Sequence, residues 1–431
     1  MLKITPSEKE GIKLASKFDG TNRFHYAWII AIAGVLITGA GVGIFNSTLG
    51  VFIIPVTYEL GFMRGQFTAY TTISMITMVI LMPYFGSLFT RFGFRRIALS
   101  AAAAVGLVLL GFSFSTQLWH FYALAVVSGM FINGMGMMAV GILINKWFDD
   151  KKGVATGIAF SGSGLMAAFM IPVSNMIIEA YGWRFGFQFL AAVTLVTLMS
   201  VILFIIKDSP EDIGLKPYSV KKEDGNVQKP ASPVSVGLTR AEAIRKVSFW
   251  LLVLSVFGIG LSQAGAHVKT VAFLNDIGYS PAFAATAASV YMVILTGNKV
   301  VIGWLMDRLG ALKGGLLMGA CCAIFPIFAL FAGYVPMVWA YVVVLSIASS
   351  GATILGPIIT ARYFGRKDFA KVFSIVSMAT MTGVAISIPG LGFVFDATGA
   401  YDLAWYLIIG FGILVCVCLV GVHIIRGKEV L

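Results

Sequence analysis

Three side chains able to carry a positive charge lie inside long apolar stretches of this sequence, more than three residues from either end: His267, Lys269 and Lys299. The 19 acids, in contrast, all lie in polar segments or near the ends of the apolar stretches. A charge at the centre of a bilayer costs on the order of 2.5 to 3.5 kcal/mol, so each cation should face a partner or a cavity. This pattern suits an anionic ligand and argues against a site for metal ions or cationic substrates.

Lys299 lies well inside its apolar stretch. It precedes Asp307 by eight residues, which places it roughly 12 Å from the cytoplasmic end of a helix that rises 1.5 Å per residue. At that depth we expect the ammonium group to pair with a carboxylate, as a point charge without the fork of a guanidinium. The alternative is a lysine that extends along the helix face toward the membrane surface.

His267 lies in the outer half of the preceding apolar stretch, with Gln263 one turn earlier on the same face. A histidine there can donate a hydrogen bond to a carboxylate or carry a proton near neutral pH. The alternative is a structural histidine bonded to a neighbouring backbone carbonyl. Lys269 follows two residues later, on a different face, and reads as a cation near the outer surface or on the path of the substrate.

Two amides complete the set of candidate substrate-binding residues. Asn46 and Asn133 lie in otherwise apolar, glycine-flanked stretches. Such amides orient small polar ligands or bridge helices, and the sequence leaves both roles open.

The apolar stretches identify the class of protein. Hydrophobic residues make up 58% of the 431 residues and charged residues only 12%, against roughly a quarter in soluble domains. We therefore predict an all-α polytopic membrane protein. The predicted spans are 26–54, 66–88, 97–116, 119–145, 154–178, 186–206, 248–273, 282–306, 314–333, 336–361, 372–395 and 402–425.

The positive charges give the orientation. Of the 31 lysines and arginines, 27 fall on one side of twelve alternating spans, and only Arg64 and Arg184 fall in loops on the other. Since cytoplasmic loops are rich in these residues, we expect both termini in the cytoplasm and the protein in the inner (plasma) membrane. The first 25 residues have no signal-peptide pattern. The net charge of +12 is thus a topology signal, and nucleic acid is excluded as a partner.

One long polar connection, rich in proline and in charges of both signs, divides the spans and predicts a flexible linker. The predicted parts are a cytoplasmic segment 1–25, a six-helix half 26–206, the cytoplasmic linker 207–247, a second half 248–425 and a cytoplasmic tail 426–431.

An internal repeat relates the two halves. GSLFTRFG from Gly86 returns as GWLMDRLG from Gly303, 217 positions later, and EAYG corresponds to DATG at the same spacing. WFDDKKG from Trp147 corresponds to YFGRKDF from Tyr363, 216 positions later. Three loops that agree in order on one spacing indicate two parallel halves, which is a transporter layout.

The repeated loops resemble the signature of the major facilitator superfamily, Gly-x-x-x-Asp-Arg-x-Gly-Arg-Arg/Lys. In the first copy, GSLFTRFGFRR, Thr90 replaces the usual acid, whereas the second copy keeps Asp307. The resemblance covers nearly the whole chain and implies twelve transmembrane helices in two pseudo-symmetric six-helix halves, and a monomer. It also implies that both loops stabilise one gating state. The residues concerned are Gly86, Arg91, Gly93, Arg95, Asp307 and Arg308.

Within that superfamily, WFDDKKGVATGIAFSGSGLM is similar to the start of span 5 in the monocarboxylate transporter family, with its bacterial and oxalate/formate exchanger relatives. FHYAWIIAIAGVL and HVKTVAFLNDIG are similar to parts of that family's spans 1 and 7. The resemblance implies that Lys299, four residues before Gly303, stands where the family has its substrate-binding arginine.

The chain departs from the family pattern at two positions. Leu295 stands where proton-coupled members usually have an aspartate, which excludes proton coupling through that acid. Asn46 stands where many animal members have a lysine. Proton coupling would then run through His267 or Lys299.

These observations favour a secondary transporter of small organic anions that works by alternating access around a central cationic site. Monocarboxylates such as lactate or pyruvate, with proton coupling, are the first expectation. The alternatives are an exchanger of small dicarboxylates of the oxalate/formate type and a non-transporting sensor of the same fold. No catalytic, cofactor or metal pattern is found: FSGSG lacks the glycines of a nucleophile motif, and the four cysteines have no ligand spacing.

Overall fold

The computed structural model describes residues 25–219 and 237–430, without the side chains of residues 46–47 and 427–430. Ten helices in this part of the chain are long and apolar enough to cross a membrane. Two of them are too long for one crossing, Lys152–Ile205 with 54 residues and Pro281–Leu330 with 50. Each contains a glycine with non-helical backbone, Gly182 and Gly310, where one helix ends and the next begins. The described chain thus has the twelve spans that the sequence predicts.

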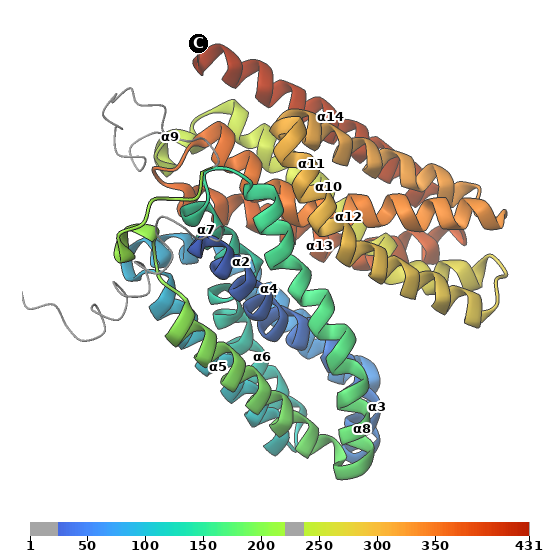
Figure 1. Ribbon diagram of the computed structural model, residues 1–431. Coiled ribbons are helices and arrows are strands. Elements are labelled where there is room, and N and C mark those ends of the chain that lie inside the picture. The colour runs from blue at the N-terminus through green and yellow to red at the C-terminus, as the bar shows by residue number, and fades with distance from the viewer. Residues whose placement is uncertain (1–24, 220–236, 431) are drawn as a thin grey trace, which may run out of the picture. The chain divides into compact units, whose positions relative to one another are not determined.

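The described residues fall into two compact units. The first takes in the chain up to Met78 and from Leu88 to the linker. Its segments, blue to light green in Figure 1, are α2 (Tyr26–Thr38), η1 (Gly39–Thr48), η2 (Leu49–Phe52), α3 (Ile53–Leu60), most of α4 (Arg64–Phe92), α5 (Phe94–Phe114), α6 (Leu118–Phe131), η3 (Ile132–Gly134), α7 (Met137–Trp147), α8 (Lys152–Ser200), η4 (Val201–Ile205) and η5 (Pro210–Ile213).

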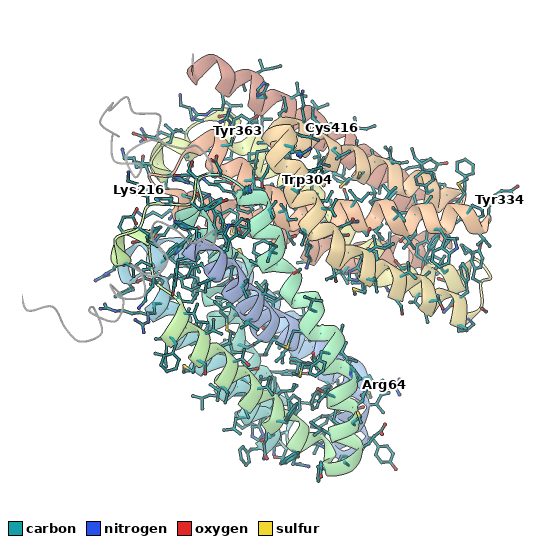
Figure 2. All side chains as sticks on the ribbon, viewed as in Figure 1. Arg64, Lys216, Trp304, Tyr334, Tyr363 and Cys416 are labelled. Carbon is teal, nitrogen blue, oxygen red and sulfur yellow. The ribbon has the colours of Figure 1, made fainter. Side chains whose placement is uncertain are left out.

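The second unit takes in the chain after the linker together with Val79–Ser87 of α4. Its segments, yellow-green to red in Figure 1, are α9 (Arg240–Ile244), α10 (Val247–Asp276), α11 (Pro281–Leu330), α12 (Val335–Phe364), α13 (Phe369–Thr398) and α14 (Asp402–Val430). Most helices extend a few residues past the apolar runs, because a helix continues into the polar boundary of the membrane where its side chains are solvated. Tyr334 and Tyr363, labelled in Figure 2, mark the two ends of α12.

The backbone repeats between the halves. Three pairs of glycines with positive φ are each 217 positions apart: Gly61 and Gly278, Gly93 and Gly310, and Gly182 and Gly399. Their φ values are 70° and 100°, 79° and 78°, and 82° and 69°. Residues with a Cβ rarely adopt such values, so glycine fixes the same turns in both halves. The repeat seen in three loops of the sequence is therefore a repeat of backbone geometry.

The described ends of the predicted linker each form a backbone hydrogen bond with a neighbouring loop. At the first end, the backbone amide of Tyr218 donates a hydrogen bond to the carbonyl oxygen of Trp147 at 2.9 Å. At the second end, the backbone amide of Leu238 donates to the carbonyl oxygen of Phe364 at 2.9 Å. Both ends thus attach to the loops that carry the WFDDKKG and YFGRKDF repeats.

Hydrogen bonds with Thr239 at the start of α9 lower the pKa of Glu242.

Candidate functional site

Lys299 lies on α11 and is 5% exposed, so the side chain is buried as the sequence indicated. The preceding residue, Asn298, donates a hydrogen bond from Nδ2 to the hydroxyl of Ser346 on α12 at 2.9 Å. The hydroxyl of Ser350, also on α12, donates to the carbonyl of Leu295 at 3.5 Å. At the level of Lys299, α11 therefore meets α12 through hydrogen-bonding side chains.

His267 lies on α10, half-buried, and its ring stacks on Tyr291 of α11 with 4.7 Å between ring centroids and 25° between planes. Tyr291 is 2% exposed, and its hydroxyl donates to Ser349 Oγ on α12 at 2.9 Å. Among the described residues the imidazole has this aromatic partner and no hydrogen-bonded one. Its two nitrogens lie at the ring edge, away from the face that the tyrosine covers.

Other polar groups lie on α10 within a turn of His267. Gln263, one turn earlier, is 9% exposed. One turn later, the hydroxyls of Thr270 and Tyr341 lie 3.2 Å apart. The amide of Gly265 donates to the hydroxyl of Ser387 on α13 at 2.7 Å, so α13 places a polar group directly against the α10 backbone. The structure thus brings Gln263, His267 and Lys299 into one unit, on two adjacent helices.

Lys269 lies on another side of α10, as its position two residues after His267 implies. Its Nζ lies 3.5 Å from the position that a Cβ on Gly392 of α13 would occupy. The lysine is half-buried and its stem covers this glycine. It is therefore directed at α13, whereas His267 is directed at α11.

The two candidate amides lie in the first unit, in segments where the helices lose α-geometry. Asn133 is in the 3₁₀ segment η3, is 2% exposed, and donates from Nδ2 to the carbonyl of Met78 on α4 at 2.8 Å. This contact bridges helices. Asn46 is in the π-helical segment η1, and its side chain lies outside the described residues. Gly41 of η1 packs against Met135, directly after η3, so the two irregular segments are in contact. Irregular backbone at membrane depth is tolerated where protein or a polar cavity covers it.

An acid from a distant part of the sequence packs against the first repeated loop, and the sequence interpretation missed it. Where Thr90 replaces the usual aspartate, Asp208, just after η4, accepts a hydrogen bond from the amide of Arg95 at 2.7 Å. Its carboxylate also lies against Gly93, at the start of α5. The guanidinium of Arg95 donates to the carbonyl of Leu203 at 2.6 Å. An anion at a helix N-terminus is favourable, so Asp208 caps α5.

We predict that Asp208→Ala lowers the free energy of unfolding by about 1 to 2 kcal/mol, because the first turn of α5 loses a charged acceptor. Thermal unfolding of the detergent-solubilised protein measures the effect. Glu211→Ala, which removes an exposed acid three residues later, is the matched control and should unfold like the wild type. Equal melting of both variants with the wild type would contradict the capping role.

The remaining loop residues lie as follows. The guanidinium of Arg91 is 5.1 Å from the ring centre of Phe92, and that of Arg308 is 4.3 Å from the ring centre of Trp304, labelled in Figure 2. Asp307 precedes Arg308 on α11. Gly86 belongs to the segment grouped with the second unit, where a Cβ would collide with a backbone carbonyl of α13. The gating role of these residues stays a prediction.

Tyr291 and Ser349 also escaped the sequence interpretation. Aromatic and hydroxyl residues are common in membrane helices, and neither has a motif that distinguishes it. The signal available was spacing: Tyr291 precedes Lys299 by eight residues, or about two turns, and therefore shares its helix face.

The fold and this site define a polytopic α-helical membrane protein of two repeated halves, with a buried lysine and a half-buried histidine on adjacent helices. Residues 31–313 and 268–428 match the model of the Major Facilitator Superfamily. The chain belongs to this superfamily of transporters.

Named relatives agree with the sequence resemblance. Monocarboxylate transporter 13 of Bos taurus is 23% identical over 404 residues, covering 90% of this chain and 89% of its own. Monocarboxylate transporter 12 of Xenopus laevis is 25% identical over 339 residues, which cover 74% of this chain and 71% of the relative. The MFS-type transporter YhjX of Escherichia coli is 24% identical over 362 residues, covering 81% and 83%.

A solved structure of the fucose:proton symporter FucP of Escherichia coli has the same fold. It matches with a TM-score of 0.66 over 92% of this chain and 98% of that chain, at 14% sequence identity. At this identity the likeness concerns the fold alone. It confirms the predicted all-α architecture.

Proposed function

We propose that this chain is a secondary transporter of small organic anions, first among them short monocarboxylates such as lactate or pyruvate, moved with protons by alternating access. The observation that carries the proposal is the burial of Lys299 on α11. A charged lysine within an apolar helix is energetically unfavourable. A transported carboxylate that pairs with the ammonium group would offset this cost and would explain why a lysine stands there.

The surroundings of Lys299 suit this role. A carboxylate pairs with an ammonium group far more strongly where water is scarce, because the local dielectric is low. His267, on the adjacent helix, adds a donor at its ring edge and is the candidate to carry the coupled proton. The names of the relatives also support a carboxylate substrate. We place the protein in the plasma membrane as a monomer with both termini in the cytoplasm.

A second candidate is the exchange of small dicarboxylates such as oxalate. Leu295 favours it, because this apolar residue lies one turn before Lys299, at the position where proton-coupled relatives carry an acid. Without that acid, the charge of an incoming anion is balanced most simply by an outgoing one. Lys299 would then bind one carboxylate of the dicarboxylate, and His267 would bind the other.

Uptake by reconstituted liposomes tests both candidates. Radiolabelled lactate and oxalate are offered with and without an inward proton gradient, and with and without the same anion inside. Lactate uptake that rises with the proton gradient supports symport. Uptake that ignores the gradient and requires internal anion supports exchange. Uptake of neither anion under any condition would sink the proposal and leave a non-transporting sensor.

A further inference from the structure

We propose that Tyr291 is a positioning residue that holds the imidazole of His267 for the transported carboxylate. The inference rests on the proposed function. It adds Tyr291 to Lys299 and His267, together with the hydrogen bond to Ser349 that tethers the tyrosine. It stands on the stack between the His267 and Tyr291 rings and on the hydrogen bond from Tyr291 to Ser349.

The stack restricts the histidine. With 4.7 Å between centroids and 25° between planes, one face of the imidazole is covered by the phenol ring. Turning the ring out of this plane would lose the contact, so the stack holds the plane of the imidazole. Both nitrogens lie in that plane, and a carboxylate oxygen must approach along it to accept a hydrogen bond.

Tyr291 is itself fixed from the other side. Its ring is 2% exposed, and its hydroxyl donates to Ser349 on α12 at 2.9 Å. Three helices thus meet at one level: α10 supplies the histidine, α11 the tyrosine and α12 the acceptor of the tether. Because Tyr291 and Lys299 share one face of α11 about two turns apart, the same helix positions both basic groups of the candidate site.

A second stacked tyrosine in this unit supplies the matched control. Tyr279, just before α11, stacks on Phe283 with 4.7 Å between ring centroids and 21° between planes, and its hydroxyl donates to the carbonyl oxygen of Ala332 at 2.8 Å. It therefore resembles Tyr291 in its stack and in its hydrogen bond, but its ring covers a phenylalanine and not His267. Loss of either hydroxyl removes one hydrogen bond, and only the loss at Tyr291 frees the ring that covers His267.

The test is a set of lactate uptake curves in proteoliposomes for Tyr291→Phe, Ser349→Ala, the double variant and Tyr279→Phe. Each of the first two should raise the KM by about threefold with little change in maximal rate, the size expected for one hydrogen bond. The double variant should match the single ones, because both remove the same bond. Tyr279→Phe should behave as the wild type. Additive effects, or equal effects at Tyr279, would overturn the proposal.

A second measurement does not depend on transport. The chain has four histidines, so replacing His25, His120 and His423 leaves His267 as the single imidazole signal in a proton NMR spectrum. The tyrosine ring should shift the imidazole protons upfield, and this shift should be lost in Tyr291→Leu. An unchanged shift would overturn the positioning role. If the wild type takes up neither lactate nor oxalate, the proposed function fails, and the spectrum alone decides whether Tyr291 holds His267.

Discussion

Replacing Lys299 with alanine is expected to reduce carboxylate uptake by roughly a hundredfold, because the loss of one partner of a desolvated charge pair costs about 2 to 5 kcal/mol. The folded protein should remain, since alanine removes a buried charge and is a good helix former. Initial rates of lactate and oxalate uptake in proteoliposomes with matched amounts of protein measure the effect.

Two further variants separate the charge of Lys299 from its other properties. Lys299→Arg keeps the charge and should retain a measurable part of the uptake, with an altered preference between lactate and oxalate because a guanidinium binds a carboxylate through two donors. Lys313→Ala removes an exposed lysine from α11 beyond the break at Gly310 and should leave uptake unchanged. Full activity in Lys299→Ala would show that the anion binds elsewhere.

The sequence predicted the spans well because hydropathy reports burial in a membrane directly. It also singled out Lys299, because this residue interrupts an apolar run. The sharp ends of the helices inside α8 and α11 follow from Gly182 and Gly310, and the repeat identifies both loops. Hydropathy could not predict the π-helical and 3₁₀ geometry of η1 and η3, because it reports composition and not which carbonyl each backbone amide bonds to.

The candidate site was predictable in its charges and not in its contacts. His267 and Lys299 stand out because ionisable groups are rare in apolar runs. Tyr291 does not stand out, since its role depends on which helix α10 packs against, and that is a property of the fold. Asp208 was missed for a similar reason: it lies more than a hundred residues from Arg95, whose amide it caps.

The two halves share a pattern of close helix packing at equivalent positions. A Cβ on Gly43 of η1 would collide with the carbonyl oxygen of Ser163 on α8. In the second half, a Cβ on Gly260 of α10 would collide with the carbonyl oxygen of Thr380 on α13. Gly260 lies 217 positions after Gly43, and Thr380 lies 217 positions after Ser163. Helices in a membrane gain stability by close approach of small residues, so each half has the same contact point between its first and fifth spans.

Gly260→Val should destabilise the second unit by about 3 kcal/mol or more, because the new side chain forces α10 away from the backbone of α13 and disturbs the bond between Gly265 and Ser387. The melting temperature in detergent and the fraction of monodisperse protein measure the loss. Gly43→Val should cause a loss of similar size in the first unit.

Gly410→Val is the matched control, since Gly410 lies in α14 of the same unit and no atom lies within 4 Å of its Cβ position. It has the same cost in helix propensity without the collision. Unfolding of Gly260→Val at the temperature of the Gly410→Val protein would show that α10 and α13 do not depend on this contact. A large loss confined to Gly260 and Gly43 would instead make the repeated glycines the points at which each half is held together.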